Sequence, residues 1–143
     1  MQEISAGGVV YRVNQEGYQI LLIHDRYGKM TLPKGKKEGQ ETEEENALRE
    51  VLEETNITGR IIQKLHTIHY TYGHPSHGEV EKTVHYYLIE AIEGEIKPQL
   101  EEIQHVGWYS VEEAYLTQKE KGYPNNHIIF DKAYDALQLN KGV

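Results

Sequence analysis

The sequence contains no cysteine, and this absence removes several kinds of chemistry. Without a thiol the chain can form no disulfide, hold no zinc–thiolate site and use no thiolate nucleophile. The absence also agrees with a reducing compartment such as the cytoplasm. Phenylalanine is nearly missing as well, with one residue against 11 tyrosines. Because tyrosine joins an apolar ring to a polar tip, this usage favours aromatic surfaces that stay partly hydrated.

Long apolar runs and basic charge are also scarce. No apolar stretch approaches the roughly 20 residues of a membrane-spanning helix, and residues 1–12 lack the basic-then-apolar order of a signal peptide. The 15 Lys and Arg residues face 23 Asp and Glu residues, which gives a formal net charge of −8. Binding of nucleic acid in bulk favours a basic surface. We therefore expect a soluble, cytoplasmic protein with neither a membrane nor bulk nucleic acid as its partner.

The order of apolar and turn residues predicts one mixed α/β domain over residues 1–143. Strand and helix patterns alternate without a linker or a repeat, which favours a mixed sheet flanked by helices. Ser110 and Glu113 form a capping box that starts one helix, and another helix follows Pro124. The expected strands span residues 4–13, 18–24, 61–72, 81–91 and 106–110, with loops at 14–17 and 73–80.

Residues 43–55 carry the clearest helix signals in the chain. Thr42 and Glu45 form a second capping box, which places the helix start. Asn56 follows the last turn, and asparagine tolerates the left-handed conformation that ends a helix. The predicted buried face consists of Ala47, Leu48, Val51 and Leu52.

Glu50, Glu53 and Glu54 share a neighbouring face of this helix, close to its C-terminal end. The helix dipole disfavours negative charge there, and like charges three or four residues apart cost about 0.2–0.5 kcal/mol per pair. One interpretation is a solvated face in a glutamate-rich chain. The other is a cation site, since hard divalent ions such as Mg²⁺ prefer carboxylate oxygens. The residues around the glutamates favour the second interpretation.

These glutamates belong to a longer series with fixed spacing. Gly35 is followed after five residues by Glu41, and after seven more by the run REVLEETNI at 49–57. The series over residues 35–57 resembles the Nudix box, G-x₅-E-x₇-R-E-U-x-E-E-x-G-U, in which U is aliphatic. Asn56 stands where the family has glycine, and Gly39 is one residue further from the glutamate than in many relatives. Neither departure removes a carboxylate.

The resemblance implies a Nudix-type α/β/α sandwich that hydrolyses phosphoanhydride bonds in nucleoside diphosphate derivatives. It also implies Mg²⁺ as the cofactor, with Mn²⁺ as an alternative. The implied metal ligands are Glu50, Glu53, Glu54 and the carbonyl of Gly35. An acidic protein can bind a polyphosphate in this way because metal ions and a local basic loop reverse the field at the site.

The resemblance assigns roles to individual side chains as well. Glu53 is a ligand or the general base, Arg49 orients the glutamates, and Glu41 helps to fix the loop–helix junction. Glu102, in the loop before the last strand, resembles a glutamate that serves as base or extra ligand in relatives, and Glu101 is the alternative. The implied catalytic residues are Arg49, Glu50, Glu53, Glu54 and Glu102.

The substrate-binding residues are less clearly marked. Three lysines of the PKGKK segment are candidates for phosphate contacts, and tyrosines for stacking on a base, although solvent exposure or core packing explains each of them as well. In the strand at 81–91, residues 83, 85, 87 and 89 share one face and 84, 86 and 88 the other; one face is expected in the core and the other along a groove. The candidates are Lys34, Lys36, Lys37, Tyr72, His85 and Tyr87, with Tyr70, His74 and His77 as further options.

Four functions remain open at this point. The segments SAGGVVYR, LPKGK, KTVHYYL and IQHVGW resemble most closely the bacterial diadenosine-tetraphosphate hydrolases of the Nudix family, which predicts ATP and AMP as products. The alternatives are a MutT-like nucleoside triphosphate pyrophosphohydrolase and an RNA 5′-pyrophosphohydrolase. A regulator that binds a nucleotide without turnover is a fourth, disfavoured by the complete set of carboxylates. In each case the partner is a small nucleotide or a nucleotide end.

Overall fold

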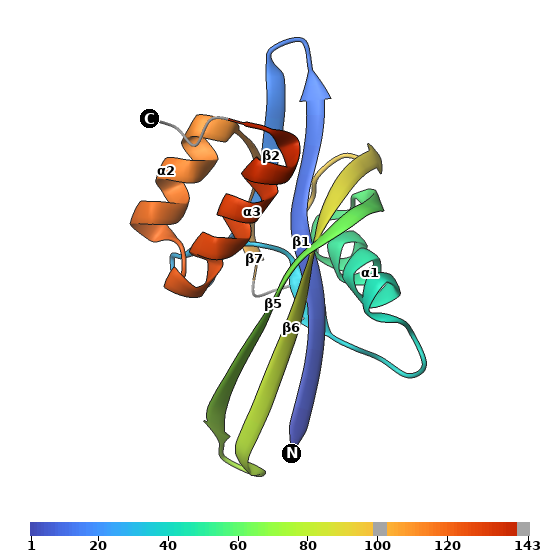
Figure 1. Ribbon diagram of the computed structural model, residues 1–143, viewed down its shortest axis with the longest axis vertical. Helices are drawn as coiled ribbons and strands as arrows, with labels where there is room; N and C mark the ends of the chain where they lie inside the picture. Colours follow the sequence, from blue (N-terminus) through green and yellow to red (C-terminus); the bar gives the residue numbers. More distant parts are fainter. Residues whose placement is uncertain (99–102, 140–143) are drawn as a thin grey trace.

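The structure is a computed structural model, which describes residues 1–98 and 103–139. One helix covers one side of a central sheet, and two helices cover the other side (Figure 1). The predicted fold class, a mixed sheet flanked by helices, is thus confirmed. The strands are β1 (Gln2–Asn14), β2 (Gly17–Asp25), β3 (Met30–Thr31), β4 (Lys34–Lys36), β5 (Thr58–His74), β6 (Gly78–Glu93) and β7 (Ile103–Ser110). The helices are α1 (Glu43–Thr55), α2 (Val111–Lys121) and α3 (His127–Leu137), with a 3₁₀ turn, η1 (Pro124–Asn126), before the last.

The strand β1 organises the sheet because it pairs with three others. It runs parallel to β6 and antiparallel to β2 and β4. The strand order is β3-β2-β1-β6-β5, with β4 on β1 and β7 on β2. The strand β4 pairs with the first half of β1, and β2 pairs with the second half. The short segment β4, which leads into α1, therefore lies next to the central strand β1.

Both faces of the sheet are buried at its centre. Val84, Tyr86 and Leu88 pack in one cluster with residues of α2 and α3. Tyr87 and Ile89 pack in a second cluster with residues of α1. Both faces of β6 therefore contribute to the core, where the sequence predicted one. The predicted groove is present as well, because Val84 and Tyr86 also line a cavity.

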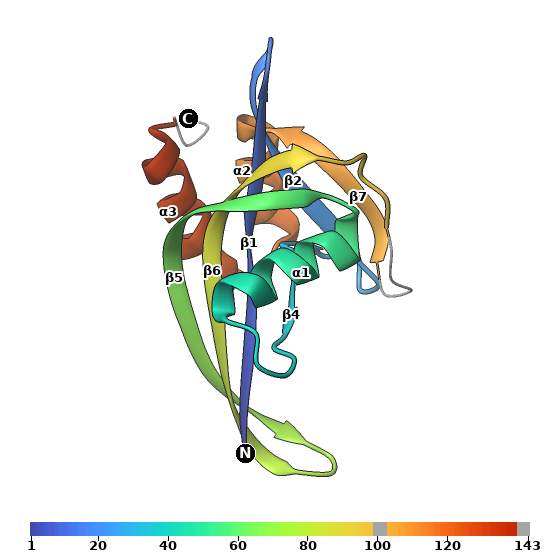
Figure 2. The ribbon, with the colours of Figure 1, turned by 90° about the vertical axis from the view of Figure 1, so that its right-hand side faces the viewer.

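The β5–β6 hairpin is longer than the sequence predicts. Residues 73, 74 and 78–80 were expected in a loop and lie in the strands, which turn within residues 75–77. Gly78 at the turn has φ +70°, a conformation that glycine adopts without strain. Residues 2–4 of β1 and 69–83 of the hairpin form an arm that extends beyond the helices (Figure 2).

Both predicted capping boxes are present. Thr42 and Glu45 exchange hydrogen bonds at the start of α1, and Ser110 and Glu113 do the same at α2. Asn56 ends α1 with φ 67°, as expected for a left-handed residue. The buried face of α1 differs from the prediction, because Leu52 is 46% exposed while Asn46 and Glu50 are buried.

Within the described part of the chain, none of the helices combines the length and the apolar character that crossing a membrane requires.

Candidate active site

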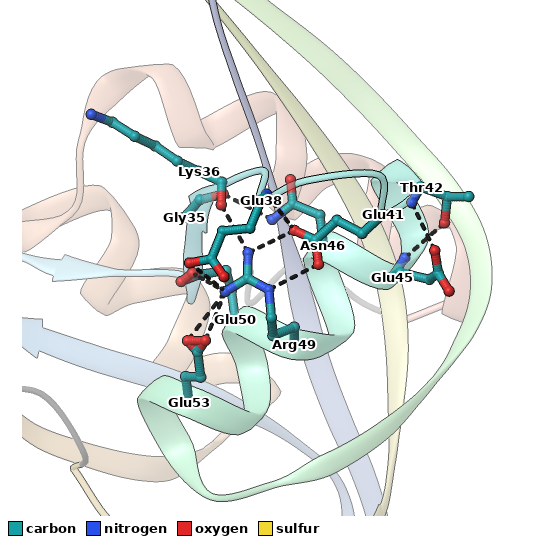
Figure 3. Close-up of polar contacts among 10 residues, drawn as sticks. All are labelled: Gly35, Lys36, Glu38, Glu41, Thr42, Glu45, Asn46, Arg49, Glu50 and Glu53. Atoms are coloured by element: carbon teal, nitrogen blue, oxygen red, sulfur yellow. Dashed lines mark hydrogen bonds and ion pairs between the residues drawn. The ribbon is translucent and has the colours of Figure 1, made fainter.

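The site begins where β4 meets α1. A Cβ atom on residue 35 would lie 2.1 Å from Oε2 of Glu50, so only glycine leaves room for this carboxylate. The carbonyl of Gly35 accepts a hydrogen bond of 3.1 Å from Nδ2 of Asn46, which is fully buried (Figure 3). The backbone N–H of Lys34 donates to Oε1 of Glu54 at 3.1 Å. Short polar contacts therefore fix β4 against the helix that carries the glutamates.

Arg49 is the centre of the carboxylate cluster (Figure 3). Its Nε and Nη2 donate to the two oxygens of Glu41 at 2.9 and 2.7 Å, a bidentate pair. Its Nη1 donates to Glu53 at 2.7 Å and to Glu50 at 3.3 Å. Nη2 also donates to the carbonyl of Lys36 at 2.8 Å. One guanidinium thus orients the loop and two glutamates of the helix.

The electrostatics of the cluster are uneven. Burial raises the pKa of Glu50, Arg49 opposes that rise, and the charge of Glu53 adds to it. The hydrogen bonds from Arg49 lower the pKa of Glu41, and those same contacts raise the pKa of Arg49. Glu50 is only 8% exposed. A buried carboxylate beside another is costly, and Arg49 offsets only part of that cost, so the arrangement favours binding of a further cation.

A cavity of about 530 Å³ opens beside these residues. Lys34, Gly35, Glu50 and Glu54 form one part of its wall. The pKa of Lys34 is lowered by burial and by the nearby charge of Lys82. The remaining wall is mostly apolar and aromatic, with one carboxylate and a few amide and hydroxyl groups: Ile23, Asp25, Thr31, Leu32, Ile68, Tyr70, Val84, Tyr86, Ile103, Tyr123, Asn125 and Asn126.

The structure brings some of the predicted residues to this cavity and places others elsewhere. Among the described residues that line it are Lys34, Gly35, Glu50, Glu54 and Tyr70. Arg49 and Glu53 lie beside it, in the cluster described above. Glu101 and Glu102 fall outside the described residues.

The other predicted substrate contacts are absent from the described lining of the cavity. Lys36 pairs with Glu3 at 3.2 Å, and the hydroxyl of Tyr72 donates to Glu3 at 2.7 Å. Tyr87 is buried against α1, and His85 lies on the same face of β6, 4.0 Å from Glu43. Lys37 and the histidines of the hairpin do not line the cavity either.

Sequence reasoning missed Asn46 and the wall contributed by the segment before α3. Asn46 interrupts the apolar face of α1, and that interruption is its only signal in the sequence. Tyr123 donates to Asp25 at 2.5 Å, which fixes the segment against β2. Asn125 and Asn126 follow directly and line the cavity. No local pattern links these residues to the box, because the fold alone makes them neighbours.

The donor set fits a hard divalent cation in its chemistry. Glu50, Glu54 and the carbonyl of Gly35 offer oxygen ligands at one part of the cavity wall, and Mg²⁺ prefers a few carboxylates together with substrate phosphates. In residues 1–98 and 103–139, no three carboxylate or imidazole side chains are already arranged to hold a metal ion. The pairing of Glu53 with Arg49 is consistent with that finding.

Comparison with known proteins identifies the family. The family model of the NUDIX domain matches residues 1–132. The chain belongs to the Nudix family. Nudix hydrolases generally use divalent metal ions. The predicted family membership is therefore confirmed.

Two of the proteins that are similar in sequence show how far the similarity extends. The MutT4 protein of Mycobacterium tuberculosis is 40% identical over 121 residues, which cover 79% of this chain and 48% of that protein. Nudix hydrolase 4 of Arabidopsis thaliana is 35% identical over 103 residues, 71% of this chain and 48% of that protein. The chain thus spans about half the length of these relatives.

Solved Nudix structures share the fold over nearly the whole chain. A C. elegans Ap4A hydrolase, in a binary complex, is 26% identical with a TM-score of 0.71, covering 95% of this chain and 98% of that one. The NUDIX domain of Shewanella oneidensis NrtR, complexed with ADP ribose, is 17% identical with a TM-score of 0.71, and the match covers 96% of this chain and 89% of that one. The second similarity is one of fold alone.

Proposed function

We propose that this chain is a metal-dependent Nudix hydrolase that cleaves phosphoanhydride bonds in nucleoside diphosphate derivatives. One observation carries the proposal: Glu50, Glu54 and Gly35 face a single cavity while Arg49 holds Glu41 and Glu53 beside it. The volume of about 530 Å³ is within the usual range for small-molecule sites.

Gly35, Glu50, Glu53 and Glu54 are the proposed metal-holding residues, with Mg²⁺ as the proposed ion and Mn²⁺ as its alternative. When bound, such an ion supplies polarisation of phosphoryl oxygens and a more acidic water. Glu53 is 42% exposed, and both of its oxygens accept hydrogen bonds from Arg49, which orients its carboxylate.

The other side chains of the site bind and orient the substrate. Lys34 offers an ammonium group to the phosphates from the cavity wall, and the neighbouring Glu54 is fixed by the backbone of the same residue. Arg49 positions Glu53 and Glu41. The general base stays a prediction, with Glu53, Glu102 and Glu101 as candidates.

Diadenosine polyphosphates, cleaved to ATP and AMP, are the leading substrates. The C. elegans Ap4A hydrolase shares the fold over almost its entire length, and Tyr70 and Tyr123 give the cavity aromatic surface suited to adenine. Nucleoside triphosphates are the second candidate, because the similarity to MutT4 is the higher of the two sequence similarities. An RNA 5′-triphosphate and binding without turnover stay as further alternatives.

Product analysis tests the proposal directly. Purified protein with Mg²⁺ is incubated with diadenosine tetraphosphate, and the nucleotides are separated by chromatography. We expect equal amounts of ATP and AMP, loss of turnover in excess chelator, and a loss of at least about 100-fold for Glu53→Gln, as is usual when an acid–base group is removed. Glu44→Gln, an exposed glutamate on the same helix, is the matched control and should be unchanged.

The failing outcomes point in different directions. Unchanged turnover in Glu53→Gln contradicts the assignment of the helix, and turnover in chelator contradicts the metal mechanism. If the folded, metal-loaded protein leaves diadenosine tetraphosphate intact but cleaves nucleoside triphosphates or capped RNA, the substrate changes and the site stands.

A further inference from the structure

We propose that an aromatic ladder on the arm binds a second nucleobase, one that lies beyond the phosphate chain of the nucleotide in the cavity. The ladder consists of Tyr70, Tyr72, His74 and His77. The inference rests on the proposed function, since it requires phosphates to lie near Glu50, Glu54 and Lys34. It adds a binding surface that continues from the cavity wall at Tyr70 outward along the arm, and it names the chemical class that this surface accepts.

The ladder is continuous with the cavity. Successive rings are neighbours, with centroids 6.4 Å apart between Tyr70 and Tyr72, 6.5 Å between Tyr72 and His74, and 4.6 Å between His74 and His77. Tyr70 is both the first ring of the ladder and part of the cavity wall. Since alternate residues of a strand share one face, the first three rings follow β5 outward along the arm. A ligand that leaves the cavity past Tyr70 therefore meets a run of aromatic rings.

The ring of Tyr72 is fixed before any ligand arrives. Its hydroxyl donates to Glu3 at 2.7 Å, and Glu3 in turn accepts from Lys82 at 2.8 Å. Both Glu3 and Lys82 are largely buried, so this anchor is rigid. A ring held in place loses little freedom when a base stacks on it, which favours binding.

Charge on this face also suits the ligand. Lys36 pairs with Glu3 at 3.2 Å, and its side chain is 66% exposed. Its carbonyl accepts from Arg49 of the carboxylate cluster, and its ammonium group pairs with the carboxylate that anchors Tyr72, so this residue links the cluster to the ladder. The alternation of β6 places Glu79 and Glu81 on the opposite face from Val80 and Lys82, which pair with Tyr72 and Tyr70.

The ligand that fits is a heteroaromatic base joined through phosphates to the first nucleotide. Tyrosine and histidine rings bind bases of any sequence by stacking, because every base has a π-face. The strand rise of about 3.3 Å per residue gives the rings from Tyr70 to His74 a length of roughly 13 Å, enough for one or two bases. The second adenosine of a dinucleoside polyphosphate has this chemistry, and so has the nucleotide after the 5′ end of an RNA.

Equilibrium binding in the Glu53→Gln background with Mg²⁺ tests the ladder. Calorimetry compares diadenosine tetraphosphate, which carries two bases, with ATP, which carries one. We expect tighter binding of the dinucleotide, and we expect Tyr72→Leu and His74→Leu to weaken it by about tenfold while ATP binding stays the same. Tyr72→Phe keeps the ring and should keep most of the affinity. His69→Ala, on the opposite face of β5, is the matched control and should change neither affinity.

Other results would overturn the inference. They are equal affinity for the two ligands in the parent protein, equal losses for both ligands in Tyr72→Leu, or full affinity in both leucine variants. Circular dichroism and urea unfolding of the leucine variants separate a lost ring from a lost fold, and His74→Leu serves if Tyr72→Leu unfolds. A parallel series with a 5′-triphosphorylated RNA trinucleotide identifies the source of the second base. The ligand whose affinity falls in the leucine variants is the one that the ladder binds.

Chromatography of each sample keeps this inference separate from the proposed function. If wild-type protein hydrolyses neither compound but the leucine variants still lose affinity for the dinucleotide alone, the proposed function fails and the ladder stands. If hydrolysis occurs as expected and the leucine variants bind the dinucleotide normally, the ladder fails and the proposed function stands.

Discussion

Residue 35 carries no side chain, and the space next to it holds the carboxylate of Glu50. The distance of 2.1 Å from an added Cβ to Oε2 is far below any real contact, so a larger residue has to displace Glu50 or β4. The sequence identifies Gly35 as part of the box, but it does not show why glycine is required at this position. The reason is packing between two segments that the fold brings together.

Replacement of Gly35 by alanine tests this packing. We expect Gly35→Ala to lower the free energy of unfolding by about 1–3 kcal/mol, because the new methyl group overpacks the junction, and to reduce metal-dependent turnover. Urea unfolding and the product assay measure the two effects. Gly73→Ala is the control, since a Cβ there meets no atom within 4 Å. Equal stability of the two variants would contradict the account.

Asn46 acts on the same carbonyl from the helix. Its Nδ2 donates to the oxygen of Gly35, while its own Oδ1 is buried without a partner among the described residues. A buried acceptor without a donor costs stability, which is tolerated where a group serves another purpose. Here the amide orients a proposed metal ligand.

The effect of Asn46 is measurable with the metal alone. We expect Asn46→Ala to weaken Mn²⁺ binding by about tenfold, as is usual when a group that orients a ligand is lost. Electron paramagnetic resonance of free Mn²⁺ gives the affinity, and circular dichroism checks the helix. Glu44→Gln should bind Mn²⁺ like the parent. Unchanged affinity in Asn46→Ala would remove this residue from the site.

At the scale of the element, α1 combines strong local signals with a long-range correction. Its caps and its bounds were predictable, because they depend on residues within one turn. Its buried face was not: Leu52 was expected in the core and is exposed, while Glu50 is buried. The helix presents a carboxylate to the interior because Gly35 leaves room for it and Arg49 offsets part of its charge.

The end of α1 shows how a departure from the family pattern is accommodated. Asn56 adopts φ 67°, and its Nδ2 donates to the carbonyl of Glu95 at 2.9 Å, a bond that glycine lacks. We expect Asn56→Gly to change the free energy of unfolding by less than about 1 kcal/mol, since relief at positive φ offsets the lost bond. Asn56→Ala gains no such relief and should lose about 1–2 kcal/mol. Urea unfolding of the two variants measures this difference in stability. An alanine variant as stable as the glycine variant would contradict the expected effect of the positive φ.

At the scale of the whole molecule, the contacts that matter join segments far apart in the chain. The cavity wall takes residues from β2, from β6 and from the segment before α3. Their identities are visible in the sequence, but their proximity follows from the strand order β3-β2-β1-β6-β5, which no local pattern contains. The box was predictable because its residues are close together in the sequence. The cavity wall was not predictable, because its residues come from distant segments.

Glu3 provides a test of such a long-range contact. The hydrogen bond from Lys82 is the largest cause that lowers the pKa of Glu3, from 4.5 to about 2. A carboxyl group with a lowered pKa stabilises the fold above its ordinary pKa, and this stability is lost as the pH falls from about 4.5 towards 2. We expect Glu3→Gln to lower the free energy of unfolding by about 1–3 kcal/mol at pH 7, because Lys82 loses a charged partner.

Urea unfolding at pH 7 and at pH 3 measures the contribution of Glu3. The difference between the parent protein and Glu3→Gln should shrink at the lower pH, where the parent has lost part of the same interaction. Glu16→Gln, an exposed glutamate in the β1–β2 turn, is the control and should show no such dependence. A constant difference at both pH values would show that Glu3 acts through packing and not through its charge.

The parallel pairing of β1 with β6 also bears on how the protein is made. Gly7 pairs with Tyr86, so β1 has to wait until β6 has left the ribosome before this parallel ladder can close. Until then it has only the β2 hairpin and β4 as partners, and its other edge stays open. Because distant pairings close slowly, the N-terminal hairpin and α1 can form early during translation. The sheet is completed only after β6 and β7 have been synthesised, and the cavity only after the segment before α3 has followed.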